Sequence, residues 1–286
     1  MIALHVSVQS TSLWGQWSLD PIALIGIPLA ALLYARGLRS MAPRKRYHAS
    51  WRPWSFYGGL TFIFLALVSP LDHLAEELFY AHMIQHVGLM MIGVPLVLLG
   101  APMIPILRGI PRSTRRSLVI PIARSLPVRF VLRTLTRPLV AWPLYVGVFS
   151  FWHTPALFDA SIENDALHIV EHLLFAAAAY AFWWNIVDPL PLKSNLSYLA
   201  RIPYIFITVV PSFLLGAFLT FSGSAWFETY QTSTARYGFT PVEDQELGGV
   251  IMWILGSFII GTALMIDLYL AVRTEQRAQL AEESAG

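Results

Sequence analysis

The stretch that decides the fold runs from Ser69 to Gly100 and reads SPLDHLAEELFYAHMIQHVGLMMIGVPLVLLG. Its first residues have the pattern of a helix start. Ser69 can cap the helix, Pro70 suits the first helical position, and Asp72 complements the positive end of the helix dipole. From Leu78 onward the stretch is apolar enough and long enough to cross a bilayer. It therefore predicts a membrane-spanning helix.

Two histidines interrupt this apolar run near its beginning. His82 and His86 are four residues apart, so on a helix their imidazoles lie on one face and can converge on one atom. Met90 continues the same stripe one turn deeper. Because polar side chains are costly inside a membrane, histidines at this depth indicate a functional site.

The composition indicates a membrane protein. Hydrophobic residues make up 56% of the 286-residue chain and charged residues 13%, whereas soluble domains are typically about a quarter charged. No polar block is long enough for a separate soluble domain, so we expect one transmembrane domain over residues 1–286. The chain has no cysteine, which excludes disulfides, thiolate metal sites and cysteine nucleophiles. The first residues do not resemble a signal peptide.

Seven segments are apolar enough to span the membrane as helices of about 20 residues. They are residues 19–37, 54–68, 78–99, 138–153, 166–187, 202–221 and 248–271. We therefore expect an all-α, polytopic membrane protein with seven transmembrane helices.

The positions of the basic residues predict the orientation of these helices. All but one of the 19 Lys and Arg residues fall on the same side, the exception being Arg236. Since basic residues mark the cytoplasmic side, the topology is N-out and C-in. Segment 101–137 is then a basic cytoplasmic loop and segment 223–247 an outer loop. The position of the basic loop after a membrane span favours contact with anionic lipid over nucleic-acid binding.

Five of the eight histidines fall at the same depth in this topology, within roughly 10 Å of the outer boundary at the helical rise per residue. They are His82, His86, His153, His168 and His172. Imidazoles in this number are typical of a metal site, and they suit copper, zinc, iron and nickel. We expect His82, His86, His168 and His172 to be ligands and His153 to be a fifth ligand or relay.

Two other residues are candidates for this site. Glu171 could orient an imidazole by accepting a hydrogen bond from its N–H, and the thioether of Met90 is a weaker candidate ligand for copper(I). A single histidine at a membrane interface is more often an ordinary interfacial side chain, which is our interpretation of His5, His48 and His73. Chance explains five at one depth poorly, so a shared site is the better interpretation.

Two other functions remain possible for the same histidines. His168-x-x-Glu171-His172 matches the H-x-x-E-H pattern of inverted zinc proteases, in which Glu171 would be the general base. This five-residue pattern is weakly specific. Alternatively, two histidines on the third and fifth helices could ligate a haem, which would make the protein an electron carrier.

The last outer segment contains a helix start of its own. Thr240 and Glu243 have the spacing of a capping box, with Pro241 at the first helical position. We therefore expect the seventh helix to begin well before its apolar run.

Together these motifs resemble the CtaG-type cytochrome oxidase assembly factors, which are seven-span bacterial membrane proteins. The resemblance covers about residues 50–270. It rests on S-P-L-D at 69–72, H-M-x-Q-H at 82–86, F-W-H-x-P at 151–155, H-x-x-E-H-L at 168–173 and T-P-x-E-D-Q-x-L-G-G at 240–249.

The resemblance implies a non-enzymatic protein of the bacterial inner membrane that helps a haem-copper oxidase to mature. It also implies copper as the metal that the protein handles. An oxidase subunit or a copper donor protein would be its partner.

Overall fold

The computed structural model describes residues 16–285 except 19, 42–47, 193 and 195. Within these residues the regular elements are helices, and there is no strand. In chain order they are α1 (Pro21–Ser40), α3 (Arg52–Val68), α4 (Pro70–Glu77), α5 (Phe79–Val87), η2 (Gly88–Gly93), α6 (Val94–Leu99), α7 (Met103–Gly109), α8 (Arg112–Thr114), η3 (Arg115–Val119), α9 (Ile120–Arg124), α10 (Leu126–Leu135), α11 (Pro138–Trp152), α12 (Pro155–Glu163), α13 (Asp165–Val187), α14 (Tyr198–Phe221), η4 (Glu228–Tyr230), η5 (Thr234–Tyr237), α15 (Pro241–Val250), η6 (Ile251–Leu255) and α16 (Gly256–Ala285).

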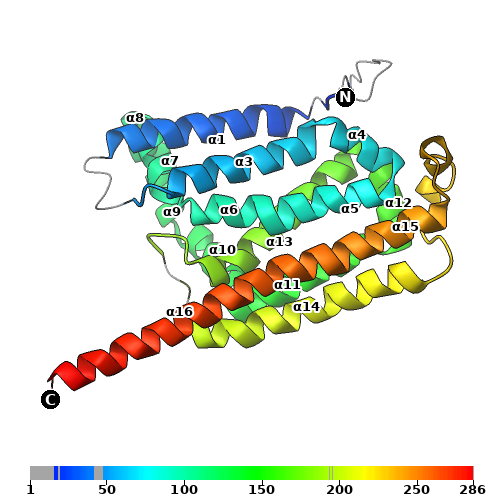
Figure 1. The fold of residues 1–286 in the computed structure, drawn as a ribbon. Helices are drawn as coiled ribbons and strands as arrows, with labels where there is room; N and C mark the ends of the chain where they lie inside the picture. The colour runs from blue at the N-terminus through cyan, green and yellow to red at the C-terminus, as the bar shows by residue number, and fades with distance from the viewer. Residues whose placement is uncertain (1–15, 19, 42–47, 193, 195, 286) are drawn as a thin grey trace.

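The long helices form one bundle in which successive members run in opposite directions (Figure 1). A helix occupies each of the seven predicted positions. Among the described residues, five segments are long and apolar enough to cross a membrane, and α3 with α4, bent by 48°, would make a sixth. Helix α11 is also apolar but has only 15 residues. An all-helical protein with several candidate spans is therefore confirmed, whereas seven crossings and their orientation remain predictions.

The stretch from Ser69 to Gly100 contains a break that its pattern does not reveal. Ser69 caps α4 by accepting from the Leu71 N–H, as predicted. At Leu78 the backbone is extended, so α4 ends and α5 begins as a separate helix. The carboxylate of Asp244, on α15, accepts from the N–H groups of Phe79 and Tyr80 at 2.7 and 3.0 Å. A residue distant in sequence thus caps α5.

The helical run α5–η2–α6 lies at the centre of the bundle. It is the most buried of the five candidate spans, and it contacts α3, α13 and α15. Leu89 and Met90 of η2 pack with Phe175 and Phe182 of α13 in the largest core cluster. The histidines of α5 are therefore enclosed by neighbouring helices on several sides.

The two ends of the bundle differ in their short helices. We call the end with α4, α12, η4 and η5 the histidine end, and the end with α7, α8 and α9 the arginine end (Figure 1). Segment 101–137, predicted as a loop, consists largely of helices α7 to α10. Helix α7 packs closely on α1 at two glycines. A Cβ on Gly37 would collide with the Pro105 carbonyl, and a Cβ on Gly109 would collide with the Leu33 carbonyl.

The last helix begins where its capping box predicts. Thr240 caps α15 by accepting from the Glu243 N–H, and the Glu243 carboxylate accepts from the Thr240 N–H in return. A continuous helical run then follows through η6 and α16 to Ala285.

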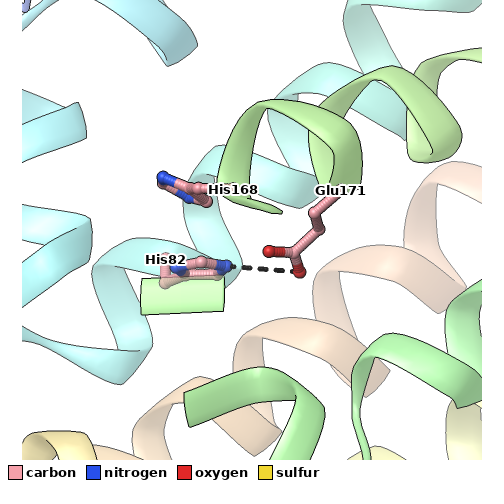
Figure 2. Close-up of side chains that lie close together, drawn as sticks. All are labelled: His82, His168 and Glu171. Carbon is pink, nitrogen blue, oxygen red and sulfur yellow. Dashed lines mark ion pairs between the residues drawn. The ribbon is translucent and has the colours of Figure 1, made fainter. Parts of the chain in front are cut away.

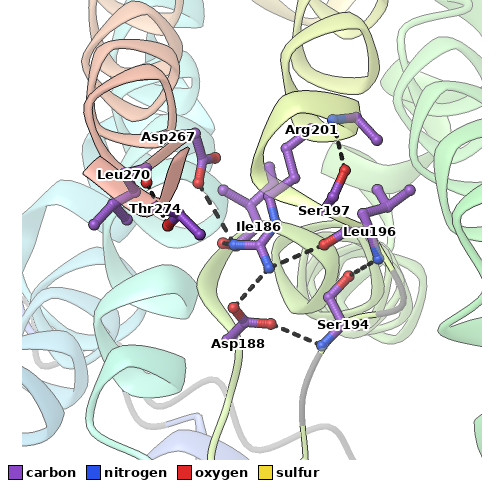
Figure 3. A network of polar contacts seen from close by, with 10 residues as sticks. Ile186, Asp188, Ser194, Leu196, Ser197, Arg201, Asp267, Leu270 and Thr274 are labelled. Atoms are coloured by element: carbon purple, nitrogen blue, oxygen red, sulfur yellow. Dashed lines mark hydrogen bonds and ion pairs between the residues drawn. The ribbon is translucent and has the colours of Figure 1, made fainter. Parts of the chain in front are cut away.

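A buried ion network joins α13, α14 and α16 away from the histidine end of the bundle (Figure 3). Arg201 of α14 is 3% exposed. It donates to Asp188 at 2.6 Å and to Asp267 of α16 at 3.5 Å, and also to the Ile186 carbonyl. Asp267 is a lone carboxylate in an apolar run, which is a recognisable sequence signal for a buried polar contact. The network stabilises the arrangement of α13, α14 and α16.

Candidate metal site

The structure brings the two predicted histidine pairs together at the histidine end. The ring centroids of His82 and His168 are 5.4 Å apart, and those of His86 and His172 are also 5.4 Å apart. Within each helix the paired rings lie 4.2 and 4.3 Å apart. All four side chains are buried. The histidine pair of α5 therefore lies next to the histidine pair of α13.

Tyr230 determines which nitrogen of His82 is available. The Tyr230 hydroxyl donates its only proton to the Ala75 carbonyl at 2.7 Å. The His82 Nδ1 atom, 3.4 Å from that hydroxyl, must therefore be the donor in their contact. A neutral imidazole that carries its proton on Nδ1 keeps a lone pair on Nε2. This Nε2 faces the interior of the cluster and can bind a metal ion.

Glu171 lies between the histidines of α5. Its Oε1 is 3.9 Å from the Nε2 of His82 and 3.9 Å from the Nε2 of His86. Figure 2 shows the first of these contacts. Both distances exceed a hydrogen bond. Neither carboxylate oxygen has a hydrogen-bond partner within the described part of the chain. A buried carboxylate is costly unless a cation compensates its charge.

Among the described residues, three side chains form a compact group of possible metal ligands. One ligand atom from each of His82, His168 and Glu171 lies within 4.8 Å of the others. We call these three residues the His82 triad (Figure 2). Two imidazoles and a carboxylate are a donor set that zinc accepts, and imidazole also suits copper. The residues present therefore fit a divalent metal ion.

The other predicted ligands surround the triad. Both ring nitrogens of His86 lack a hydrogen-bond partner among the described residues. The same is true of the Nε2 of His172. His153 donates from Nδ1 to the Phe149 carbonyl at 2.7 Å, which leaves a lone pair on its Nε2. The sequence predicted Glu171 as an orienting residue or, in the zinc-protease alternative, as the general base. Its position among the donor atoms makes it a candidate ligand.

Met90 does not belong to the triad. It lies in the π-helical segment η2, which interrupts the regular α-helical stripe that begins with His82 and His86. Its side chain lines a cavity together with His86 and His153. The regular spacing used in the sequence analysis therefore does not hold beyond Val87.

Three supporting residues were missed because their partners are distant in sequence. Gln85 donates to Asp72 at 2.6 Å and to the Ala66 carbonyl at 2.9 Å, and so joins α5 to α4 and α3. Asp244 caps α5, and Tyr230 orients His82. A polar Gln85 between two histidines of an apolar run was a usable signal, whereas nothing local marks Tyr230.

The fold and the site define a class: an all-helical, multi-pass membrane protein with a buried histidine–carboxylate cluster near one end of its bundle. Residues 32–274 match the model of the cytochrome c oxidase caa3 assembly factor family, Caa3_CtaG. The chain belongs to this family, as its motifs predicted.

The relatives found among curated proteins are mycobacterial. An uncharacterized protein of Mycobacterium bovis is 25% identical over 248 residues, which cover 84% of this chain and 37% of the relative. One of Mycobacterium leprae is 28% identical over 220 residues, covering 71% of this chain and 32% of the relative. The chain thus spans about a third of the length of these relatives. No solved structure matches it.

Proposed function

We propose that this protein assists the maturation of a haem-copper cytochrome c oxidase by binding copper at its histidine cluster. Membership of the assembly factor family supports the role in maturation. The role is non-catalytic, and the partner is an oxidase subunit or a copper donor protein. The protein acts in the bacterial inner membrane, with the histidine end at the outer side.

One observation carries the metal-binding part of the proposal. The lone pair of His82 Nε2 and the carboxylate oxygen Oε1 of Glu171 face each other at 3.9 Å in a buried site. Both atoms are acceptors, and they are too far apart to share a proton. A metal ion bound by both would compensate the carboxylate and satisfy the imidazole.

Copper is favoured over zinc and haem for different reasons. The His82 triad fits zinc as well, but the family acts on an oxidase that requires copper. A haem would need a flat space between two imidazoles. Instead, Phe158 packs 5.0 Å from His82 and Phe175 packs 4.5 Å from His86, measured between ring centroids.

The placement of Glu171 also favours binding over proteolysis. A general base must reach a water molecule beside a bound peptide. Glu171 is fully buried, and its carboxylate is directed at His82 and His86. This arrangement supports a role for Glu171 in holding the metal.

Elemental analysis of the full-length protein, purified without chelator, tests the proposal. We expect a stoichiometric amount of copper in the wild type and a large loss in the double variant His82→Ala, His168→Ala. Cytochrome c oxidase activity should fall in parallel when this variant replaces the wild type in a host that lacks its own family member. His73→Ala is the matched control, because His73 is partly exposed and contacts only Glu76 among the described ion pairs.

Two results would contradict the proposal. Wild-type protein that takes up no copper under these conditions would exclude the metal-binding role. Full oxidase maturation by a double variant that binds no metal would separate the histidine cluster from the function of the family.

A further inference from the structure

A cavity lined by methionines borders the histidine cluster. Its volume is about 30 Å³, roughly enough for one water-sized group. Half of the eight methionines of the chain line it, namely Met83, Met90, Met91 and Met252. All four are buried. His86 and His153 line the same cavity, so it adjoins the cluster without including the His82 triad.

Irregular helix geometry brings these methionines together. Met90 and Met91 belong to the π-helical segment η2, and Met252 belongs to the π-helical segment η6. Consecutive side chains of an α-helix point about 100° apart. A π-helical turn contains more residues, so neighbours diverge less and both Met90 and Met91 reach one cavity. Such segments inside α-helices occur frequently at functional sites.

Apolar packing alone would explain thioethers in a membrane protein, but it does not explain the imidazoles beside them. His153 is 8% exposed. Its Nδ1 donates to the Phe149 carbonyl, and its Nε2 has no hydrogen-bond partner within the described residues. Both nitrogens of His86 are likewise unpartnered in that part of the chain. The lining residues therefore offer two imidazoles and four thioethers, together with the hydroxyls of Tyr145 and Ser212.

The donor atoms of the cavity differ in chemical softness from those of the triad. Thioethers are soft ligands that select copper(I), whereas carboxylates prefer harder cations. Tyr145 contacts Met91 through its hydroxyl at 3.6 Å from the sulfur, which helps to fix that side chain. The cavity contains no carboxylate among its lining residues. It thus suits a monovalent, weakly hydrated cation.

We propose that this cavity is a copper(I) site, with ligands from the methionines of η2 and η6 and from His86 or His153. It is separate from the His82 triad, whose donor set fits a divalent ion. The inference rests on the proposed function, because it assumes that copper is the metal handled. It requires no electron transfer, since copper(I) enters and leaves the cavity in the same oxidation state.

Parallel titrations of the full-length protein test this inference. Copper(I) is titrated without oxygen against a competing copper(I) chelator, and Zn²⁺ is titrated separately. In the triple variant Met90→Leu, Met91→Leu, Met252→Leu we expect copper(I) affinity to fall by more than about 100-fold, beyond the usual effect of losing an indirect partner. Zn²⁺ affinity should not change. Met265→Leu is the control, because Met265 lies on α16 and is 64% exposed.

A measurement on the unaltered fold avoids the risk that the triple variant misfolds. Protein labelled with selenomethionine and loaded with copper(I) should show selenium next to copper in X-ray absorption spectra. Absence of a selenium neighbour, or unchanged copper(I) affinity in the triple variant, would overturn the copper(I) site and leave the proposed function intact. Wild-type protein that takes up no copper at all would overturn the proposed function itself.

Discussion

The carboxylate of Glu171 lies close to the imidazoles of His82 and His86. Substitution of Glu171 should therefore reveal whether it holds the metal. Glu171→Gln removes the negative charge but keeps the shape of the side chain. Because Glu171 lies among the candidate ligand atoms, we expect metal affinity to fall by roughly 100-fold or more, above the range for an indirect partner. Titration of the purified variant measures this. Glu163→Gln, at an exposed position, is the control.

The zinc-protease alternative makes the opposite prediction for the same variant. Loss of a general base would abolish function while leaving the metal bound. Retention of full metal occupancy together with complete loss of oxidase maturation would therefore reject the binding model.

His48, which lies away from the histidine cluster, should make the stability of the protein depend on pH. Its Nε2–H donates to the Tyr34 hydroxyl at 2.8 Å, because that hydroxyl donates to the Gly100 carbonyl. Burial, followed by the nearby Arg52, lowers the pKa of His48 below its ordinary value of 6.5. The unfolded chain therefore binds a proton more readily than the folded protein, and stability decreases as the pH falls below 6.5.

His48→Gln removes this titration and should flatten the pH dependence of thermal unfolding in detergent over that range. Unfolding curves recorded for the wild type and the variant at several pH values provide the comparison. Identical slopes would exclude a contribution from His48.

Local spacing was sufficient to predict that the two histidines of each pair lie together. His82 with His86 and His168 with His172 are four residues apart on their helices, so each pair shares a face whatever the tertiary structure. The neighbours of these pairs were not predictable in this way. Tyr230 is 148 residues from His82 in sequence, and no periodic pattern specifies such a contact.

At the scale of the helices, Asp244 carries a specific expectation. It accepts from two N–H groups at the start of α5, and no side chain of α5 caps that end. Asp244→Ala should therefore destabilise the protein by about 0.5–2 kcal/mol, the usual effect of losing a cap. Metal affinity should fall as well, because His82 lies in the first turn of α5.

Thermal unfolding and metal titration of the same preparations measure both effects. Asp244→Asn retains an acceptor oxygen and should be affected less, whereas Glu246→Ala on the same helix should behave like the wild type. Equal stability of Asp244→Ala and the wild type would show that the cap is dispensable.

Hydropathy located the long helices well, because burial in a membrane requires long apolar runs whatever their partners are. It did not locate the interruptions. The break at Leu78 depends on a cap from α15. The π-helical segment η2 lies where Gly93 packs so closely on Ile63 that a Cβ would collide with it. Both features coincide with contacts between helices, which single-helix patterns do not contain.

For the whole molecule, orientation in the membrane is the principal prediction. Helices α7, α8 and α9 lie at one end of the bundle, and the start of α5, which carries His82 and His86, lies at the other (Figure 1). A reporter fused after Gly286 should therefore be cytoplasmic, and one inserted in segment 226–238 should be external. Reporters of opposite compartment preference, assayed in intact cells, measure this. An external C-terminus would place the cluster on the wrong side for the proposed function.

The cap on α5 also has a consequence for biosynthesis. Asp244 follows Phe79 by 165 residues, which ribosomes need roughly ten to thirty seconds to add. During that interval the third predicted span is already made, but the N–H groups at its start lack their carboxylate. The first turn, with His82 in it, therefore gains its cap only when the last helix has inserted. The full metal affinity that we expect from the capped helix is therefore reached only at the end of synthesis.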